Sequence, residues 1–274
     1  MKRKYMIIVL MAGALELTGC SQGTSNSAKN GTTGSENTII SESDIAILDT
    51  EDMFTERDRD TEYDESECTA ISLSDEETKC DSDGAKMDGQ TVTITEGGTY
   101  LLTGSLSNGS VVVDTDKTEK VQLILENVSI INEEGAGICV EQADKVFITL
   151  ADGSTNKIVS NSFTGNEDTN IDGAIFSRED LTLNGSGTLK ITSAAHGIVS
   201  KDDLVLTGGV YQIQSEKQGL SGKESVRIAD GTFTITSGTD AIHSEDTDED
   251  TKGFVYITGG VLTLAAGGDG ISSS

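Results

Sequence analysis

Residues 198–219 read IVSKDDLVLTGGVYQIQSEKQG, and residues 220–241 read LSGKESVRIADGTFTITSGTDA. Apolar side chains recur at the same places in both segments: Ile198 and Leu220, Leu204 and Val226, Leu206 and Ile228, Tyr211 and Phe233, Ile213 and Ile235. Within each segment these apolar side chains recur at every second position, which is the period of a β-strand. A fixed repeat of about 22 residues built from strands predicts a solenoid of stacked coils.

The same repeat extends on both sides of this stretch. Its anchor residues are Ile175, Ile198, Leu220, Ile242 and Ile271, and the last interval contains a seven-residue insertion. The L-x-x-L-x-L-x-x-N frame of a leucine-rich repeat is missing. We therefore predict an all-β fold, a right-handed single-stranded parallel β-helix with coils of about 22 residues. Residues 92–106, 111–113, 121–130 and 138–150 fit as less regular coils.

Energetics require the coils to stack. One coil buries about six apolar side chains, each contributing roughly 1.5–3 kcal/mol. Ordering its backbone costs about 1–2 kcal/mol per residue. A single coil therefore cannot fold alone, and neighbouring coils have to share one core.

The composition excludes several classes of function. The 274 residues include 47 acidic and 19 basic side chains, which gives a formal net charge of −28 and a sequence pI near 4.1. Nucleic-acid binding depends on clustered Lys and Arg, so we expect no nucleic-acid partner. Tryptophan is absent, and Tyr211 and Phe233 fall on the inward-facing positions of the repeat. Binding of a neutral sugar by aromatic stacking is therefore not favoured.

The N-terminus has the organisation of an export signal. Lys2, Arg3 and Lys4 precede an apolar stretch of about 13 residues, which is too short to span a bilayer. The following Leu17-Thr18-Gly19-Cys20 resembles the lipobox of bacterial lipoproteins. We predict that residues 1–19 are a lipoprotein signal peptide and that Cys20 is lipidated, which places the protein outside the cytoplasm, anchored to the membrane at the cell surface. The alternative is an ordinary secretory peptide that ends near a cysteine.

Three further regions follow. Residues 20–44 are rich in Ser, Thr, Asn and Gly and predict a flexible linker. Residues 45–90 are acidic but include Met53 and Phe54, and we interpret them as an N-terminal cap docked on the folded body. The β-helix spans residues 91–274. It stops as another coil begins, so we expect it to be incomplete at the C-terminal end.

Cys68, Cys80 and Cys139 are an odd number of thiols and cannot all pair within the chain. A disulfide between Cys68 and Cys80 and unpaired thiols remain alternatives.

Several stretches resemble a known family. They are Phe54-Thr55-Glu56-Arg57-Asp58 with Tyr63-Asp64, Gly98-Thr99-Tyr100-Leu101-Leu102-Thr103-Gly104, Ala174-Ile175, Asp180-Leu181-Thr182-Leu183-Asn184-Gly185-Ser186-Gly187, His196-Gly197-Ile198 with Lys201-Asp202-Asp203-Leu204, and Asp269-Gly270-Ile271. Over about residues 45–274 the chain resembles the clostridial cell-surface lipoproteins with a carbohydrate-binding domain. The resemblance implies a right-handed parallel β-helix that binds calcium and acidic plant polysaccharides such as polygalacturonate.

One candidate metal site is a ladder of acids. Glu179, Asp202 and Glu224 occupy the same place in successive coils, about 4.8 Å apart. Carboxylates this close raise one another's pKa unless a cation neutralises them, which calcium would do. Each acid follows a base, namely Arg178, Lys201 or Lys223. The alternative is that this basic ladder neutralises the acids.

The second candidate metal site is the insertion. Glu245, Asp246, Asp248 and Asp250 lie in it, and Asp240 precedes it, with Asp269 matching Asp240 one coil later. Calcium takes six to eight oxygen ligands, which an acidic loop over a rigid coil can supply. A solvated acidic loop is the alternative.

An enzyme is the less favoured interpretation. His196 and Arg227 resemble parts of a polygalacturonase-like site, but the paired acids expected before the histidine are missing, and Asp202 and Asp203 follow it. A lyase would need a basic residue beside calcium, for which Arg227 is the candidate. Since His196 shares its repeat position with Gln218 and Asp240, we expect it to fill a corner. We predict no catalytic residue.

These observations together predict non-catalytic, calcium-dependent binding of an acidic polysaccharide, of the pectin or polygalacturonate kind, at the bacterial cell surface. With only 19 bases, direct Arg or Lys clamps along an extended glycan are not expected, so calcium would bridge the two polyanions. The alternatives are a polysaccharide lyase or polygalacturonase-like enzyme, and a purely adhesive or structural surface protein.

Overall fold

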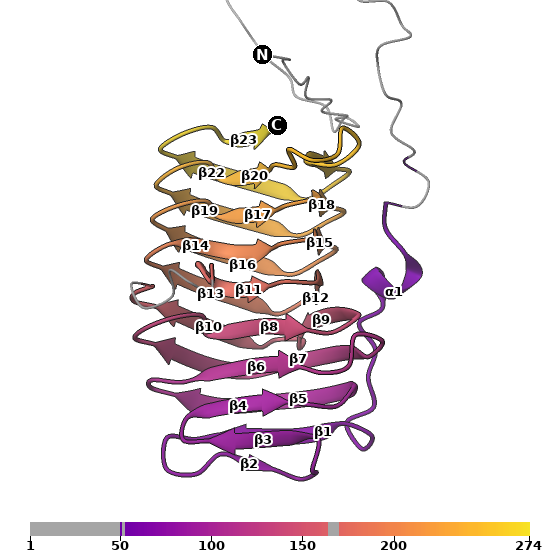
Figure 1. Ribbon diagram of the computed structural model, residues 1–274, viewed down its shortest axis with the longest axis vertical. Coiled ribbons are helices and arrows are strands. Elements are labelled where there is room, and N and C mark those ends of the chain that lie inside the picture. Colours follow the sequence, from indigo (N-terminus) through magenta and orange to yellow (C-terminus); the bar gives the residue numbers. More distant parts are fainter. Residues whose placement is uncertain (1–49, 51–52, 164–169) are drawn as a thin grey trace, which may run out of the picture.

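The computed structural model describes residues 50, 53–163 and 170–274, which form a parallel β-solenoid of about seven turns (Figure 1). The predicted signal peptide, the lipidation site Cys20 and the linker lie outside the described residues. Among the described residues the only helix is α1 (Glu56–Arg59). The predicted all-β parallel β-helix is confirmed.

Each regular turn contributes one strand to each of three columns. The first column contains β3 (Ala85–Asp88), β4 (Thr91–Ile94), β6 (Ser110–Asp114), β8 (Ile138–Gln142), β11 (Gly173–Ser177), β14 (His196–Ser200), β17 (Leu220–Gly222), β20 (Ile242–Ser244) and β23 (Ile271–Ser273). The second contains β9 (Lys145–Leu150), β12 (Asp180–Gly185), β15 (Asp203–Leu206), β18 (Ser225–Ile228) and β21 (Phe254–Ile257). The third contains β10 (Thr155–Ser160), β13 (Thr188–Ser193), β16 (Val210–Ser215), β19 (Thr232–Ser237) and β22 (Val261–Ala266).

The first turns are less regular. The long strand β7 (Lys120–Asn132) pairs with both β9 and β10, so it belongs to the second and third columns at once. Before it, β5 (Gly98–Leu106) pairs with β7 and with β1 (Thr69–Leu73). The short β2 (Lys79–Cys80) runs antiparallel to β1, as β3 does to β4. The strands β1, β2 and β3 form one end of the stack (Figure 1).

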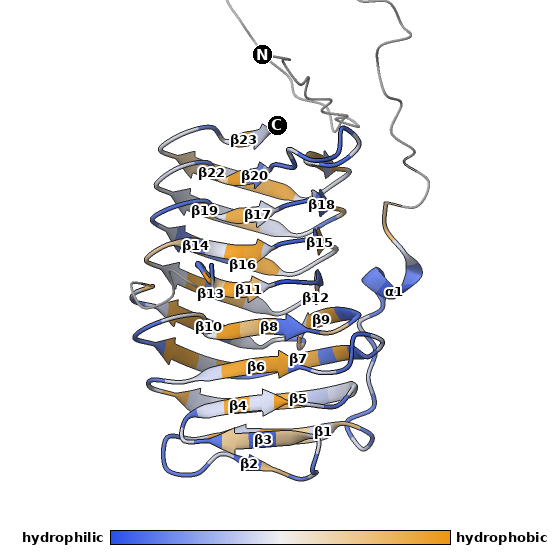
Figure 2. Ribbon diagram, in the orientation of Figure 1, coloured by the Kyte–Doolittle hydropathy of each residue, from blue (hydrophilic) through white to orange (hydrophobic). Residues whose placement is uncertain are grey.

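The predicted register is the observed one. Ile175, Ile198, Leu220, Ile242 and Ile271 are consecutive partners in the first column. Tyr211 and Phe233 stack face to face inside the solenoid, with ring centroids 4.8 Å apart, and both are fully buried. The strands carry the apolar residues and the corners the polar ones (Figure 2). Like side chains from adjacent turns therefore share one continuous core.

Glycine is required at two corners of the solenoid for its backbone conformation. Gly209 and Gly231 have φ angles of +96° and +126°. Residues other than glycine rarely adopt such positive φ angles, and a Cβ on Gly231 would lie 2.9 Å from the Phe233 ring. These glycines let each turn enter its third-column strand.

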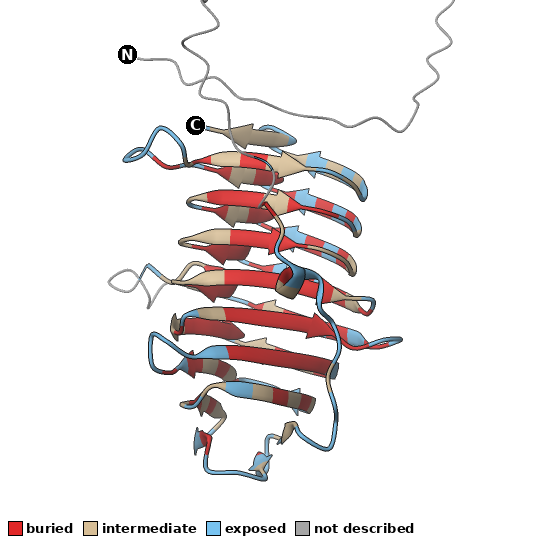
Figure 3. Cartoon of the chain, turned by 90° about the vertical axis from the view of Figure 1, so that its right-hand side faces the viewer, coloured by how far each residue is buried: buried red, intermediate tan, exposed pale blue. Residues whose placement is uncertain are grey.

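Residues 53–60, which we call the strap, lie across the outside of the second column (Figure 3). The strap holds α1, whose N-cap Thr55 forms a capping box with Asp58. Asp58 is 2% exposed; its carboxylate accepts a hydrogen bond from the Thr182 hydroxyl at 2.7 Å and forms an ion pair with Lys145 at 2.8 Å. Burial alone would raise the pKa of Asp58, but the Lys145 contact and the other hydrogen bonds hold it below its usual value.

The aromatic and basic side chains of the strap also contact the solenoid. The Arg57 guanidinium lies over the Phe147 ring at 4.5 Å and donates a hydrogen bond to Gln122 at 2.7 Å. Phe54 packs against Tyr256 in β21, with ring centroids 5.9 Å apart. These contacts extend from β7 to the last second-column strand.

Cys68, Cys80 and Cys139 are all free thiols, so the Cys68–Cys80 disulfide left open by the sequence does not form in this structure. No helix among the described residues is long and apolar enough to cross a membrane.

Candidate functional site

The acid ladder predicted from the sequence forms in part. Glu224 donates its backbone N–H to the Asp202 carbonyl at 3.2 Å, and the carboxyl groups of the two residues are hydrogen-bonded. Burial, followed by the charges of Asp180, Glu224 and Asp203, raises the pKa of Asp202 to about 7. Glu224 also forms an ion pair with Lys252. Glu179 lies at the equivalent corner one turn earlier, and its carbonyl accepts the Ser200 hydroxyl at 3.0 Å.

Within the insertion, the side chains of the predicted metal ligands face in different directions. The Asp246 carboxylate accepts the backbone N–H groups of Asp248 and Glu249, and the Asp248 carboxylate lies 3.5 Å from the Lys223 ammonium. Glu245 lies 3.6 Å from the His243 imidazole. Asp250, like Asp248, is exposed.

Asp240 and Asp269 do lie together. The Asp240 carboxylate accepts the Asp269 backbone N–H at 2.8 Å and the Ser272 hydroxyl at 2.6 Å. Burial opposes ionisation of Asp240, but these hydrogen bonds and His243 keep its pKa below the usual value. The Asp240 oxygens are thus satisfied within the protein.

The arrangement of the acids does not fit a calcium site. Across the described residues, no three His, Cys, Asp or Glu side chains converge in a way that could hold a metal ion. Calcium needs six to eight oxygen ligands around one point, whereas the acids of the insertion face lysines, histidines and backbone N–H groups, and in the ladder Asp202 and Glu224 face each other. Calcium binding stays a prediction from the sequence.

The basic ladder faces a different side of the corner from the acid ladder. Lys201 forms its ion pair with Asp172 at 3.7 Å, and Lys223 forms its ion pairs with Asp246 and Asp248 at 3.8 and 3.5 Å. Arg178 contacts Glu141 at 2.6 Å. The alternative was that the bases neutralise the acids that follow them in the sequence. Lys201 and Lys223 instead pair with other acids.

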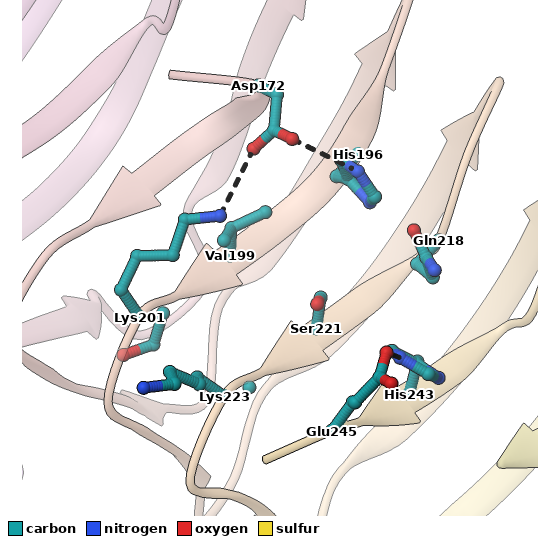
Figure 4. Close-up of a pocket in the computed structure, with 11 residues that line it drawn as sticks. Asp172, His196, Val199, Lys201, Gln218, Ser221, Lys223, His243 and Glu245 are labelled. Carbon is teal, nitrogen blue, oxygen red and sulfur yellow. Dashed lines mark ion pairs between the residues drawn. The ribbon is translucent and has the colours of Figure 1, made fainter. Parts of the chain in front are cut away.

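Lys201 and Lys223 border a groove of about 280 Å³ on the outer side of β14, β17 and β20, with Asp172 just before β11 (Figure 4). Its charged and ionisable lining residues are Asp172, His196, Lys201, Lys223, His243 and Glu245. Gln218 and Ser221 add neutral hydrogen-bonding groups between the two histidines. The lining thus gathers basic side chains and hydrogen-bonding groups on one face of an acidic protein.

Asp172 lies near three basic side chains, two of which, His196 and Lys201, line the groove. It lies 3.3 Å from His196, 3.7 Å from Lys201 and 4.0 Å from Lys217. Burial would raise the pKa of Asp172, but its hydrogen bond with His196 and the charges of His196, Lys201 and Lys217 keep it below the usual value. Its Oδ1 and the Nδ1 of His196 are buried and make no hydrogen bond to the described residues.

His196 occupies the corner position predicted for it, but it also lines the groove, which the repeat position alone did not indicate. Arg227 lies elsewhere, on the outer face of the second column. Its guanidinium forms an ion pair with Asp203 and donates to the Ser225 hydroxyl at 2.8 Å. The two residues weighed as parts of an enzyme site therefore do not meet.

The chain is similar in sequence to known carbohydrate-binding proteins. Residues 88–274 match the family model of carbohydrate-binding domain-containing proteins. A carbohydrate-binding domain-containing protein of Acetivibrio thermocellus is 35% identical over 137 residues, and the match covers 48% of each chain. The chain thus spans about half the length of the curated relative it matches.

A solved structure is similar over most of the chain. It is the gadolinium derivative of the polysaccharide lyase-like protein from C. thermocellum, with 31% sequence identity and a TM-score of 0.69. The superposition covers 75% of the present chain and 94% of the other.

Proposed function

Since the chain belongs to the family of carbohydrate-binding domain-containing proteins, we propose that its groove binds an acidic polysaccharide without cleaving it. The observation that carries this proposal is the gathering of Lys201, Lys223 and His196 in one groove of a chain with net charge −28. The ammonium groups of Lys201 and Lys223 favour a sugar carboxylate over a neutral hydroxyl group, although Asp172 and Glu245 also line the groove.

The lysines retain capacity for a ligand. The ion pairs of Lys201 and Lys223 lie at 3.5–3.8 Å, beyond the range of a normal N–H···O hydrogen bond. An ammonium group has three donors, so Lys201 and Lys223 can each donate to a carboxylate that enters the groove. Lys201 follows β14 and Lys223 follows β17, so the two cations are carried on adjacent turns. This arrangement suits a polymer with regularly spaced carboxylates.

The test is retention on insoluble polygalacturonate. Replacing both lysines, as Lys201→Ala with Lys223→Ala, should weaken retention about tenfold or more, since each charged hydrogen bond contributes about 1.5–3 kcal/mol. The matched control is Lys157→Ala with Lys190→Ala, because these exposed lysines are neighbours on the third column, away from the groove. Equal losses in the two double variants would show attraction by overall charge and would contradict the proposed site.

Calcium dependence, predicted from the sequence, is tested in the same assay. Retention that requires calcium, together with a melting temperature that rises with calcium, would support a bound ion. Retention that is unchanged in excess chelator would show that the lysines act without it.

A polysaccharide lyase is the second candidate, favoured by the similar polysaccharide lyase-like structure and by the His196–Asp172 pair beside Lys201. A lyase would release unsaturated oligomers, whose absorbance would rise during incubation with polygalacturonate. We propose the non-catalytic function and therefore expect no such product.

The cell-surface location proposed from Cys20 has its own test. Membrane fractionation should recover the wild-type protein with the membranes and a Cys20→Ala variant in the medium.

A further inference from the structure

The groove ends at a corner unlike the others. In three successive turns two residues join the first and second columns, namely Arg178-Glu179, Lys201-Asp202 and Lys223-Glu224. In the next turn residues 245–253 take their place. Because Ser200, Gly222 and Ser244 are register partners, Glu245 stands where the earlier corners have a base. The loop therefore places a negative charge at a corner position that is basic in the three preceding turns.

Both ends of this loop are fixed. Near its start Asp246 is 2% exposed, and its carboxylate accepts the Asp248 and Glu249 N–H groups at 2.7 and 3.1 Å. Near its end Lys252 forms ion pairs with Glu224 and with Glu249. The backbone around Asp248 is thus held, while the Asp248 side chain itself is 75% exposed.

The Asp248 side chain reaches back to the groove. Its carboxylate lies 3.5 Å from the ammonium of Lys223, which lines the groove and is 46% exposed. Ion pairs this exposed are weak, so the Asp248 side chain can leave at little cost. A ligand carboxylate and Asp248 would therefore compete for one cation.

We propose that Asp248 is a specificity-determining residue of the groove, holding Lys223 until an anionic ligand group displaces it. This inference rests on the function proposed above. A neutral hydroxyl group cannot replace a carboxylate beside an ammonium without losing the charge–charge attraction. The loop thereby disfavours neutral sugars at Lys223 and lowers the affinity for acidic ones by the strength of one exposed ion pair.

Titration calorimetry with trigalacturonate in excess chelator tests the inference. Asp248→Asn should bind about two- to fivefold more tightly than the wild type, the range expected from releasing an exposed ion pair. Asp250→Asn is the matched control, since it removes the same charge from the same exposed loop; among the described residues no ion pair involves Asp250. This control should bind as the wild type does.

The Lys223→Ala background supplies a thermodynamic cycle. Without its cation, Asp248→Asn should bring no gain, because the acid has nothing to compete for. Equal gains in Asp248→Asn and Asp250→Asn, or a gain that persists without Lys223, would overturn the inference. Wild-type binding with no change in Asp248→Asn would overturn it while leaving the proposed function intact. Absence of binding by every variant, both in chelator and with calcium added, would overturn both.

Discussion

The outer faces of the first and second columns share one register, but their charged side chains are paired at different distances. On the second column the strap pairs Asp58 with Lys145 at 2.8 Å, within hydrogen-bonding distance. On the first column Asp172 faces Lys201 at 3.7 Å and Lys217 at 4.0 Å, and one of its oxygens makes no hydrogen bond to the described residues. The strapped face is satisfied by the chain itself, whereas the groove face keeps donors and acceptors free.

The difference shows how one repeat produces both a structural and a binding surface. Stacking fixes the strands of both faces equally, so the fold does not distinguish them. What distinguishes them is the element that covers one face: residues 53–60 satisfy the polar groups of the second column, and the groove beside β14 and β17 stays open. Perturbing either face should therefore give separable effects on stability and on binding.

The largest effect is expected where the strap meets the stack. Asp58→Ala leaves Lys145, a largely buried cation, without its partner and removes the bond to Thr182. Breaking a buried ion pair by removing one partner costs about 3–5 kcal/mol, so the free energy of unfolding in urea should fall by about that amount. Retention on polygalacturonate, measured on the folded protein, should not change.

The control for this prediction is Asp60→Ala, two residues away. Asp60 pairs with Arg57 at the surface, where such pairs contribute about 0–1 kcal/mol. If the two variants lost equal stability, Asp58 would not be the anchor of the strap.

A smaller effect is expected at the corner between the two faces, where Asp202 has a pKa of about 7. Since this value is above that of an unfolded Asp, the native state holds the proton more tightly, and stability is lost as pH rises from about 4 to 7. Asp202→Asn removes this loss. Allowing for solvent screening, it should stabilise the protein by about 1–2 kcal/mol at pH 8.

The check on Asp202 is unfolding at two pH values. The gain from Asp202→Asn should be present at pH 8 and vanish near pH 3, where the wild-type carboxyl is protonated in both states. A gain that is the same at both values would point to packing instead of charge.

Much of the fold could be predicted because the sequence encodes it locally. Alternation within segments and the repeat near 22 residues determine which side chains face inward, and the pairing of Ile198 with Leu220 and of Tyr211 with Phe233 follows directly. The strap could not be placed in this way. Asp58 meets Thr182 across 124 residues, and no periodicity relates the two.

The sequence did not reveal the groove, because it does not show in which direction neighbouring side chains point. The sequence shows Lys201-Asp202 and Lys223-Glu224 as two adjacent ladders, which predicted either a calcium site at the acids or their neutralisation by the bases. In the structure the corner turns these neighbours to different sides, so the lysines line the groove and the acids meet each other. The signal available in the sequence was the repeated base in this column, together with its replacement by Glu245.

The smallest effect on stability is expected inside the groove, at Asp172. Because its pKa is below the usual value, the carboxylate contributes stability above about pH 4 that is lost as pH falls through its folded pKa. Asp172→Asn should therefore cost about 1 kcal/mol at pH 7, with the difference from the wild type narrowing in acid.

The same Asp172→Asn substitution should affect binding in the opposite direction from its effect on stability. It keeps the size of the side chain but removes the charge that attracts His196, Lys201 and Lys217. A sugar carboxylate then meets the Lys201 ammonium without an internal competitor, so we expect a few-fold tighter binding of trigalacturonate in calorimetry. Weaker binding would instead show that Asp172 itself contacts the ligand, for example by accepting from a sugar hydroxyl. That result would assign the groove face a mixed site in which the acid positions the sugar and the lysines hold its carboxylates.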